Sequence, residues 1–381
     1  MRICFFGTYT VSEGYPVNRV LLKGLQRIGI EIDECREELW EGFLHETFSQ
    51  RRWQTYGRLG WRLLGCYGRL IRRYQRLGKH QWVLVGYAGY LDILLARLLN
   101  WRRQRSLVLV AFISLYDTIV LDRRQVPVDS LKARALKWFE QLGFRCADLI
   151  LVDTVEHGKY LAELYHLPLE KFVRSFVGED DDFFPLLPEA QTEEMFRVLF
   201  FGTYVPLHGV DTVLAAAGHL REVPGVELVL VGKGQLYAQI RQEAEQLQLP
   251  NLRFIDQWIS PAQLREQVRQ ADVCLGIFGQ TAKAARVIPL KVFDALALGR
   301  PIITRDSPAI RELLEHERNV LLCPAGDGLA LAAAILKLKQ DPGLGKALAL
   351  AGRACFNAQA APEAVARTLV QRLERGFEQP V

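Results

Sequence analysis

The chain has 381 residues, half of them hydrophobic and about a quarter charged, with a net charge of +5 and seven cysteines. This length favours two domains, and the composition excludes a largely disordered chain. The cysteines contain no CxxC pair, which argues against a disulfide-stapled secreted domain and favours a reducing cytoplasm. A strand-like run starts the chain, so we expect no signal peptide, and no apolar run approaches the ~20 residues of a membrane-spanning helix.

The positive charge is concentrated in one stretch. Between Thr47 and Tyr116 there are thirteen basic residues and one acid, Asp92, so this stretch carries +12 and the remainder carries −7. Such asymmetry suggests an anionic partner for the first half of the chain, whereas no nucleic-acid-binding motif accompanies it and we expect no nucleic acid. Residues Arg51–Lys79 have a helical period, with an apolar side and arginines nearly opposite. The apolar side comprises Tyr56, Leu59, Leu63, Tyr67, Leu70, Tyr74 and Leu77.

Two interpretations of this helix remain open. It could pack its apolar side on a sheet and show its arginines to solvent as an ordinary solvated face. It could instead lie in the interface of an anionic membrane with its aromatic side chains inserted, which would make the protein cytoplasmic but peripheral on the inner face of the membrane.

Strand-like runs alternate with helical patterns through both halves, which predicts an α/β fold with two Rossmann-like, doubly wound parallel sheets facing a central cleft. We expect a first domain at 1–180, an acidic linker at 181–196, a second domain at 197–361 and a final helix at 362–381 that crosses back to the first domain. The expected strands are 2–6, 30–35, 81–85, 106–113, 149–152, 172–177, 198–201, 226–231, 252–255, 273–275, 302–304 and 320–322. The expected helices include 17–28, 91–101, 130–142, 156–165, 211–221, 236–247, 262–269, 290–298, 309–315 and 329–338.

Nearly the same six residues occur twice, as FFGTYT at 5–10 and FFGTYV at 200–205. Each copy ends an apolar run and precedes a helical pattern, so each is expected to be the first strand and loop of a domain. Gly7 and Gly202 would let the backbone turn sharply and approach a ligand closely. The alternative is that both are only tight strand–helix turns.

The most informative stretch runs from Leu275 to Leu314. Pro289 stands at the expected start of a helix, where the N–H groups of Leu290, Lys291 and Val292 would be free to bind an anion. Lys283 and Arg286 add positive charge, so the unit suits a diphosphate. Asp294 could accept hydrogen bonds from ribose hydroxyls. The alternative is that these cations only solvate a surface helix.

The second half resembles retaining glycosyltransferases of the GT-B fold, glycosyltransferase family 4. The similarity runs from about Arg197 to Ala361 through FFGTYVPLHGVDTVLAAA, VELVLVGKGQL, LRFIDQWIS and PLKVFDALALGRPIIT, and GIFGQTAKAARVIPLKVF resembles a bacterial subgroup. The resemblance implies donor-binding positions in these motifs, among them the base-binding loop and the Gly-rich turn. These positions are Gly202, Thr203, Tyr204, His208, Gly232, Gly234, Gln257, Trp258, Phe278, Gly279, Pro289, Leu290, Val292 and Asp294. Gly7 is expected to approach the ligand as well, because its turn repeats that of Gly202.

The sequence departs from this family at three positions. Thr203 and His208 stand where the family usually has Arg and Lys on the donor diphosphate, and Arg286 stands where it has a glutamate that binds the sugar. We infer that Lys283, Arg286 and Lys291 replace the lost cations. Two uncompensated charge-assisted hydrogen bonds, at about 1.5–3 kcal/mol each, would cripple donor binding.

The resemblance implies transfer of a sugar from a nucleotide diphosphate to a hydroxyl acceptor, a glycan or a lipid-linked sugar, with retention and without a metal or other cofactor. The predicted catalytic residues are Lys283, Arg286 and Lys291, which stabilise the leaving diphosphate, and Asp117, which orients the acceptor hydroxyl or the donor sugar. Asp117 could alternatively cap the segment that follows it. The acidic run 180–182 is attributed to the linker rather than to a metal site. The alternative function is a catalytically silent relative that binds nucleotide sugar or an anionic membrane.

Overall fold

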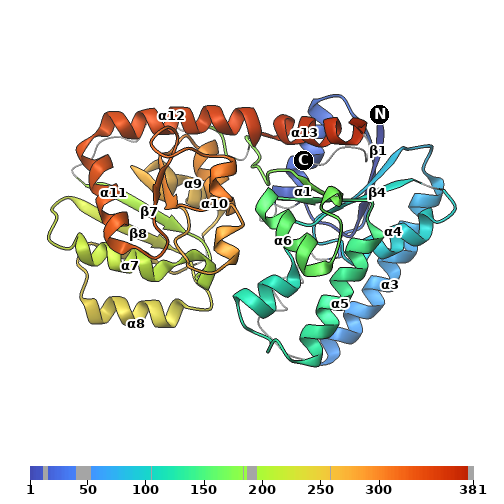
Figure 1. The fold of residues 1–381 in the computed structure, drawn as a ribbon, viewed down its shortest axis with the longest axis horizontal. Helices are drawn as coiled ribbons and strands as arrows, with labels where there is room; N and C mark the ends of the chain where they lie inside the picture. The colour runs from blue at the N-terminus through green and yellow to red at the C-terminus, as the bar shows by residue number, and fades with distance from the viewer. Residues whose placement is uncertain are drawn as a thin grey trace. The chain divides into compact units, whose positions relative to one another are not determined.

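The computed structural model describes residues 1–11, 16–39, 53–103, 105–182, 184–186, 195–257 and 259–375, without the side chains of 53–61. The chain forms two compact units (Figure 1). Unit 1 contains Met1–Val120, Val126–Val177 and the segment from Val365 onward, and unit 2 contains Leu121–Gln125 and Gly178–Ala364. Each unit is built around one six-stranded sheet, which agrees with the predicted fold class.

The sheet of unit 1 has the strand order β2-β1-β3-β4-β5-β6, with every pairing parallel. Its central strands are fully buried apolar runs, as expected for a parallel sheet covered by helices on both faces. The strands are β1 (Arg2–Gly7), β2 (Glu31–Arg36), β3 (Trp82–Val85), β4 (Ser106–Val110), β5 (Leu149–Val152) and β6 (Phe172–Arg174). The helices are α1 (Pro16–Arg27), α3 (Trp53–Arg76), α4 (Asp92–Asn100), α5 (Leu131–Cys146), α6 (Val155–Tyr165) and α13 (Pro362–Arg375), with a π-helical segment η1 (Asp117–Asp122) and a 3₁₀ turn η2 (Leu169–Lys171).

The sheet of unit 2 has the order β12-β11-β10-β7-β8-β9 and is also parallel. Its strands are β7 (Phe196–Phe201), β8 (Val226–Val231), β9 (Leu252–Ile255), β10 (Val273–Leu275), β11 (Ile302–Arg305) and β12 (Leu321–Cys323). Its helices are α7 (Val210–His219), α8 (Tyr237–Leu247), α9 (Pro261–Arg269), α10 (Leu290–Ala297), α11 (Gly328–Gln340) and α12 (Pro342–Gln359), with 3₁₀ turns η3 (Pro206–His208), η4 (Lys283–Ala285) and η5 (Ile310–Glu312).

Each sheet has a point at which the order of strand addition reverses. In unit 1 the chain places β2 on one side of β1 and β3 on the other, and in unit 2 it places β8 on one side of β7 and β10 on the other. Ligands of open parallel sheets bind beyond the carboxyl ends of the strands at such a switch point. Both FFGTY loops leave the strand at the switch point of their own sheet.

The amphipathic helix α3 uses its apolar side for packing within unit 1. Leu70 and Tyr74 are fully buried in one core cluster, and Tyr67 and Leu77 pack against it. These side chains therefore cover the sheet rather than enter a membrane, while Tyr56 and Leu59 lie outside the described side chains. On the other face of the sheet, helix α13 contributes core residues to unit 1, namely Val365, Ala366, Leu369 and Leu373.

Two elements differ from the sequence prediction. The helix expected at 309–315 is only the 3₁₀ turn η5, because Asn319 Oδ1 accepts a hydrogen bond from the N–H of Glu315 and stops further turns. Conversely, residues 342–359 form helix α12, to which the sequence analysis assigned no element. The glycines in this segment lower its helix propensity and weaken the helical pattern in the sequence. One of them, Gly352, lets α12 pack closely on α10, because a Cβ there would lie 2.8 Å from Leu296 Cδ2.

Among the residues that the structure describes, no helix has both the length and the apolar character needed to cross a bilayer.

Candidate functional site

The two repeated glycines form the same turn in both units. Gly7 has a φ of 137° and Gly202 a φ of 134°, values that favour glycine over other residues. The FFGTY repeat therefore encodes the same tight turn after the strand at the switch point of each sheet. What lies against the turn differs between the units.

In unit 1 the turn lies against a carboxyl group. A Cβ on Gly7 would be 2.6 Å from Asp92 Oδ2, and the same oxygen accepts a hydrogen bond of 2.7 Å from the N–H of Thr8. Tyr67 donates its hydroxyl to Asp92 Oδ1 at 2.9 Å. Burial raises the pKa of Asp92. The space beside Gly7 is thus filled by the protein's own carboxyl group, and the tight-turn alternative accounts for this glycine.

In unit 2 the equivalent position holds a cation. A Cβ on Gly202 would lie 3.1 Å from Lys291 Nζ. Lys291 is only 6% exposed, and its Nζ has no hydrogen-bond partner among the described residues. Nζ lies over the ring of Phe200, 3.7 Å from its centroid. A lysine Nζ without a hydrogen-bond partner among the described residues therefore lies where unit 1 has a hydrogen-bonded carboxyl group.

Burial dominates the electrostatics of Lys291. It lowers the pKa of Lys291 well below its usual value, and Asp294 opposes that shift only in part. A buried ion without a charged partner costs several kcal/mol, roughly, unless it is neutralised or paired. An anion bound beside Gly202 would provide the opposite charge that Lys291 lacks, so the electrostatics favour an anion site there.

His208 and Thr203 complete the loop after β7. The Nδ1 of His208 is hydrogen-bonded to the carbonyl oxygen of Thr203, and burial and the nearby Lys291 lower the pKa of His208 well below its usual value. The imidazole is therefore neutral at physiological pH and adds no positive charge. Arg123, which belongs to unit 2, also lowers this pKa, and the sequence analysis gave that arginine no role.

Asp294 has a carboxyl partner that the sequence analysis missed. Glu179 shares a side-chain hydrogen bond with it, and burial together with the charge of Glu179 raises the pKa of Asp294. Two buried carboxyl groups in contact hold one proton between them. Glu179 is the second residue of the segment Gly178–Ala364 of unit 2. The acidic residues that follow it in the sequence did not indicate which carboxylate would be buried.

The N-terminus of α10 partly matches the prediction. Pro289 is the N-cap residue, and the N–H groups of Leu290 and Lys291 have no backbone partner among the described residues. The N–H of Val292, however, donates to the carbonyl of Pro289 at 3.0 Å, so it is not free as expected. The reason is that the chain closes a turn as it enters the helix.

Lys283 and Arg286 differ from Lys291 in their interactions with the rest of the protein. Lys283 begins the turn η4 and is buried, and Arg286 follows that turn and is half-buried. Both interact with other groups of the protein. Lys291 differs in that Nζ, its only charged atom, is buried without a hydrogen-bond partner among the described residues.

Three glycines at predicted donor-binding positions also allow close packing between loops. A Cβ on Gly232 would lie 2.2 Å from the Gly202 carbonyl oxygen, and one on Gly234 would lie 2.5 Å from the backbone nitrogen of Tyr204. A Cβ on Gly279 would lie 2.4 Å from the carbonyl oxygen of Leu207. These glycines therefore allow the loops after β7, β8 and β10 to pack backbone against backbone.

Tyr204 and Phe278 have side chains that belong to the core. Both are fully buried and are part of the central apolar cluster of unit 2, so only their backbone groups are left to contact a donor, and their predicted binding role stays a prediction. Each follows a motif glycine, but the backbone turns its side chain inward. Gln257 is exposed beyond β9, and Trp258, predicted beside it, lies outside the described residues.

Asp117 of unit 1 is held by a network that the sequence did not reveal. It is 1% exposed and begins the segment η1, where its N–H donates to Ser114 Oγ at 3.0 Å and Tyr160 donates its hydroxyl to Oδ1 at 3.2 Å. Ser114 in turn donates to Glu140 Oε2 at 2.8 Å. Glu140 is fully buried and also accepts hydrogen bonds from Leu115 N, Tyr116 N and the hydroxyl of Tyr165.

A second buried polar pair follows β5. His157 Nδ1 lies 2.5 Å from Asp153 Oδ1, and Thr154 caps α6 by accepting a hydrogen bond from the His157 N–H. The other ring nitrogen of His157, Nε2, is buried without a hydrogen-bond partner among the described residues. Asp117 follows β4 and Asp153 follows β5, so both lie toward the carboxyl end of the sheet, where ligands of parallel sheets bind.

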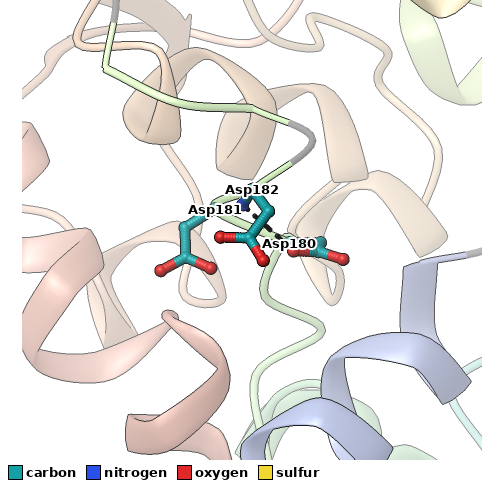
Figure 2. Close-up of side chains that lie close together, drawn as sticks. All are labelled: Asp180, Asp181 and Asp182. Atoms are coloured by element: carbon teal, nitrogen blue, oxygen red, sulfur yellow. Dashed lines mark hydrogen bonds between the residues drawn. The ribbon is translucent and has the colours of Figure 1, made fainter.

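Three consecutive carboxylates lie together at the start of unit 2 (Figure 2). The N–H of Asp182 donates to Asp180 Oδ1 at 3.1 Å, and Asp181 interacts electrostatically with Arg353. A backbone N–H group and Arg353 thus stabilise part of the negative charge of this cluster. Adjacent acidic residues are also common in proteins without a bound ion. We assign no metal to it.

Comparisons with known proteins point to one family. Residues 195–341 match the family model described as glycosyl transferases group 1. The chain is 26% identical over 211 residues to the amylovoran biosynthesis glycosyltransferase AmsK of Erwinia amylovora, covering 55% of this chain and 52% of that protein. It is 32% identical over 158 residues to the phosphatidyl-myo-inositol mannosyltransferase of Mycobacterium leprae, covering 41% of this chain and 40% of that protein. The chain thus spans about half the length, or less, of these relatives.

A solved structure agrees over nearly the whole chain. Anabaena HepE, crystallised in complex with UDP and glucose, superposes with a TM-score of 0.67 at 13% identity, covering 98% of this chain and 99% of that one. At such low identity the agreement concerns the fold. Residues 195–341 thus match a glycosyl transferases group 1 domain, and the chain as a whole has the fold of HepE.

Proposed function

We propose that this protein transfers a sugar from a nucleotide diphosphate to a hydroxyl group of a glycan or a lipid-linked sugar, with retention of configuration and without a metal ion. The observation that carries this proposal is the buried, unpaired ammonium of Lys291 at the switch point of unit 2. The match over 195–341 covers that switch point, and the relatives that it resembles are named as glycosyltransferases. The complex of HepE with UDP and glucose supports a nucleotide-sugar donor.

The proposed reaction breaks the bond between the anomeric carbon and the diphosphate oxygen and forms a bond from the acceptor oxygen on the same face of the sugar. The acceptor proton passes to the departing phosphate. Lys291 pairs with the negative charge that grows on the diphosphate, which is the electrostatic form of catalysis. Asp117, fixed by Ser114 and Tyr160, is proposed to orient the acceptor hydroxyl.

Asp294 is proposed to bind the ribose of the donor. Its Oδ1 is buried and has no hydrogen-bond partner among the described residues. A protonated carboxyl that shares its proton with Glu179 can both donate and accept hydrogen bonds, as ribose hydroxyls can.

A thermal-shift screen of UDP, GDP, ADP and their sugar conjugates, with magnesium or with a chelator, tests this proposal. We expect one nucleotide to raise the melting temperature of unit 2 by about 2–8 °C at a concentration roughly 100 times its Kd. The shift should be the same in both buffers because Lys291, rather than a metal, meets the diphosphate charge. A shift seen only with magnesium would refute the metal-free site, and the absence of any shift would refute donor binding.

The alternative is a catalytically silent relative, motivated by Thr203, His208 and Arg286 at positions where the family usually has other residues. It predicts the same nucleotide shift but neither donor hydrolysis nor transfer. Release of free nucleotide from the bound donor, measured with and without an acceptor mixture, separates the two functions.

We propose in addition that the exposed face of α3 attracts an anionic membrane carrying the acceptor. Arg62, Arg72 and Arg76 are exposed, and no carboxylate of the described residues lies within salt-bridge distance of them. Arg69 differs, because it pairs with Glu37 at 2.7 Å. The basic stretch of the sequence therefore gives α3 an exposed face whose arginines Arg62, Arg72 and Arg76 have no carboxylate partner among the described residues.

Changing Arg62, Arg72 and Arg76 together to glutamate is expected to weaken binding to vesicles containing phosphatidylglycerol by roughly 100-fold, since each cation near such a surface contributes about 1 kcal/mol. Co-sedimentation at low and high salt measures this. The matched control changes Lys132, Arg134 and Arg145, exposed cations of α5, to glutamate. Equal losses in both variants would mean that net charge, and not this face, determines binding.

A further inference from the structure

An open cavity lies in unit 1, at the end of the sheet opposite to the one where Asp117 and Asp153 lie. Its walls come from the segments that enter β3 and β4, which are neighbouring parallel strands with Trp82 opposite Ser106. It therefore lies at the amino ends of the strands, whereas Thr8, Asp117 and Asp153 follow carboxyl ends. The volume is about 760 Å³, and the lining residues are Leu77, Gly78, Lys79, His80, Gln81, Arg103 and Arg105.

The charges of this cavity are all of one sign. Lys79, Arg103 and Arg105 line it, and no described carboxylate lies within salt-bridge distance, 4.0 Å, of any of the three. The carboxylate that acts on this region from farther away is Asp33, which is paired with Arg2 at 2.8 Å. Three cations without a carboxylate partner among the described residues line one open cavity and make a local region of strong positive potential.

The arginines are held in place around Tyr74. Their Cζ atoms lie 5.4 Å (Arg103) and 5.8 Å (Arg105) from its ring centroid, and Arg105 Nη1 donates to the Tyr74 hydroxyl at 3.2 Å. That hydroxyl also donates to Asn100 Oδ1 at 2.6 Å. Tyr74 itself is fully buried, so the guanidinium groups stand on a fixed support.

His80 adds a polar wall without adding charge. Its ring contacts Gly78 O, the Tyr74 hydroxyl and Arg105. Burial and the positive charge of Arg105 lower the pKa of His80 to about 4, so it is neutral at physiological pH. Both ring nitrogens are engaged by protein groups, so the neutral ring supports Arg105 and adds no charge that would repel an anion.

We propose that this cavity binds a phosphoryl group. Planar guanidinium groups match phosphate oxygens in pairs, and a lysine ammonium adds a mobile point charge. The site is distinct from the donor site of unit 2, since all of its residues belong to unit 1, and it does not depend on the proposed transferase activity. The phosphoryl group belongs either to a free phosphate compound or to the headgroup of an anionic lipid.

Another cavity of unit 1, lined largely by residues of α4, is relevant to the choice between a free phosphate compound and a lipid headgroup. This cavity of about 540 Å³ is lined by Leu94, Arg97, Leu98, Asn100, Trp101 and Cys146. Trp101 is 80% exposed and Leu98 is 65% exposed, and Trp101 is only two residues from Arg103. An exposed indole beside an apolar cavity suits the apolar part of an amphipathic ligand, which favours a lipid as one of the two sources to test.

The test compares wild type with the double variant Lys79→Gln/Arg103→Gln. Both side chains are exposed and neither is part of the Tyr74 hydrogen-bond network, so the fold should be kept. Lys132→Gln/Arg134→Gln on α5 is the control with the same change in charge. Titration calorimetry with inorganic phosphate and with glycerol 3-phosphate tests a free ligand, and co-sedimentation with phosphatidylcholine vesicles, with and without phosphatidic acid, tests a lipid.

We expect the double variant to bind the phosphoryl ligand at least about tenfold more weakly, with the control unchanged. Loss in the calorimetric arm supports a free phosphate compound, and loss confined to phosphatidic acid vesicles supports a lipid headgroup. No phosphoryl binding by wild type in either arm, or an equal loss in the control variant, would overturn the proposal. The nucleotide-induced shift of unit 2 should be the same in all three proteins, so failure here is distinguishable from failure of the transferase proposal.

Discussion

Replacing Lys291 with methionine is expected to weaken nucleotide binding by roughly 10- to 150-fold, because charge-assisted hydrogen bonds contribute about 1.5–3 kcal/mol each. Methionine keeps the unbranched apolar stem of lysine and its packing against Phe200, but it has no charge. Without ligand, the variant should be at least as stable as wild type, since an unpaired buried ammonium is removed.

Titration calorimetry with the nucleotide identified by the screen, together with the melting temperature of the ligand-free protein, checks both parts of this prediction. Lys346→Met on α12 is the control, because Lys346 is an exposed lysine of the same unit. Wild-type affinity in the Lys291 variant would refute its role at the diphosphate. A clear drop in the melting temperature of the ligand-free variant would instead assign Lys291 a structural role.

The pH dependence of stability provides a second readout for the same lysine. Because burial lowers the folded-state pKa of Lys291, the unfolded chain binds more protons than the folded protein between that pKa and about 10.4, the ordinary lysine value. The stability of wild type should therefore rise with pH through this window relative to Lys291→Met. The penalty is fully present below the folded pKa. Nucleotide binding should take up protons in the same window, since a diphosphate favours the charged lysine.

The repeated FFGTY sequence shows how far sequence alone can reach. It predicted a strand and a sharp turn in each half, since the apolar run and the glycine act locally. It did not predict that Gly7 lies against Asp92 and Gly202 against Lys291, because each partner comes from a helix 84 or more residues away. The local element follows from local sequence, but the chemistry beside it depends on tertiary packing.

The side-chain directions in the site loops were unpredictable for the same reason. Tyr204 and Phe278 stand within the right motifs, but motif spacing does not fix whether a loop side chain faces the core or a ligand. Glu179 and Glu140 were overlooked for the converse reason. A buried carboxylate is recognisable only through its partners, which for Glu140 include Ser114, 26 residues away, and for Glu179 Asp294.

Replacing Glu140 with alanine is expected to lower the free energy of unfolding of unit 1 by about 3–5 kcal/mol, among the largest effects of any single substitution in that unit. The fully buried carboxylate accepts hydrogen bonds from Ser114, Leu115, Tyr116 and Tyr165, with distances of 2.5–3.0 Å. Its removal leaves four buried donors without their acceptor, and each unsatisfied donor costs about 1–3 kcal/mol, although the losses are not additive.

Glu140→Gln should have an intermediate effect, because the amide keeps one acceptor oxygen but turns N–H groups toward donors. Denaturant unfolding followed by a probe in unit 1 measures both variants, and Glu163→Gln, an exposed position on α6, is the control. Unit 1 must be followed separately, because two compact units need not unfold in one transition.

The same substitution tests the proposed place of Asp117 in transfer. Glu140 holds Ser114, and Ser114 Oγ accepts the N–H of Asp117, so Glu140 acts as a positioning residue for that carboxylate. In Glu140→Gln we expect sugar transfer to fall while the nucleotide-induced shift of unit 2 stays at its wild-type value. An unchanged transfer rate in a measurably destabilised variant would show that the network supports the fold of unit 1 alone and would remove the argument for Asp117 as the residue that orients the acceptor.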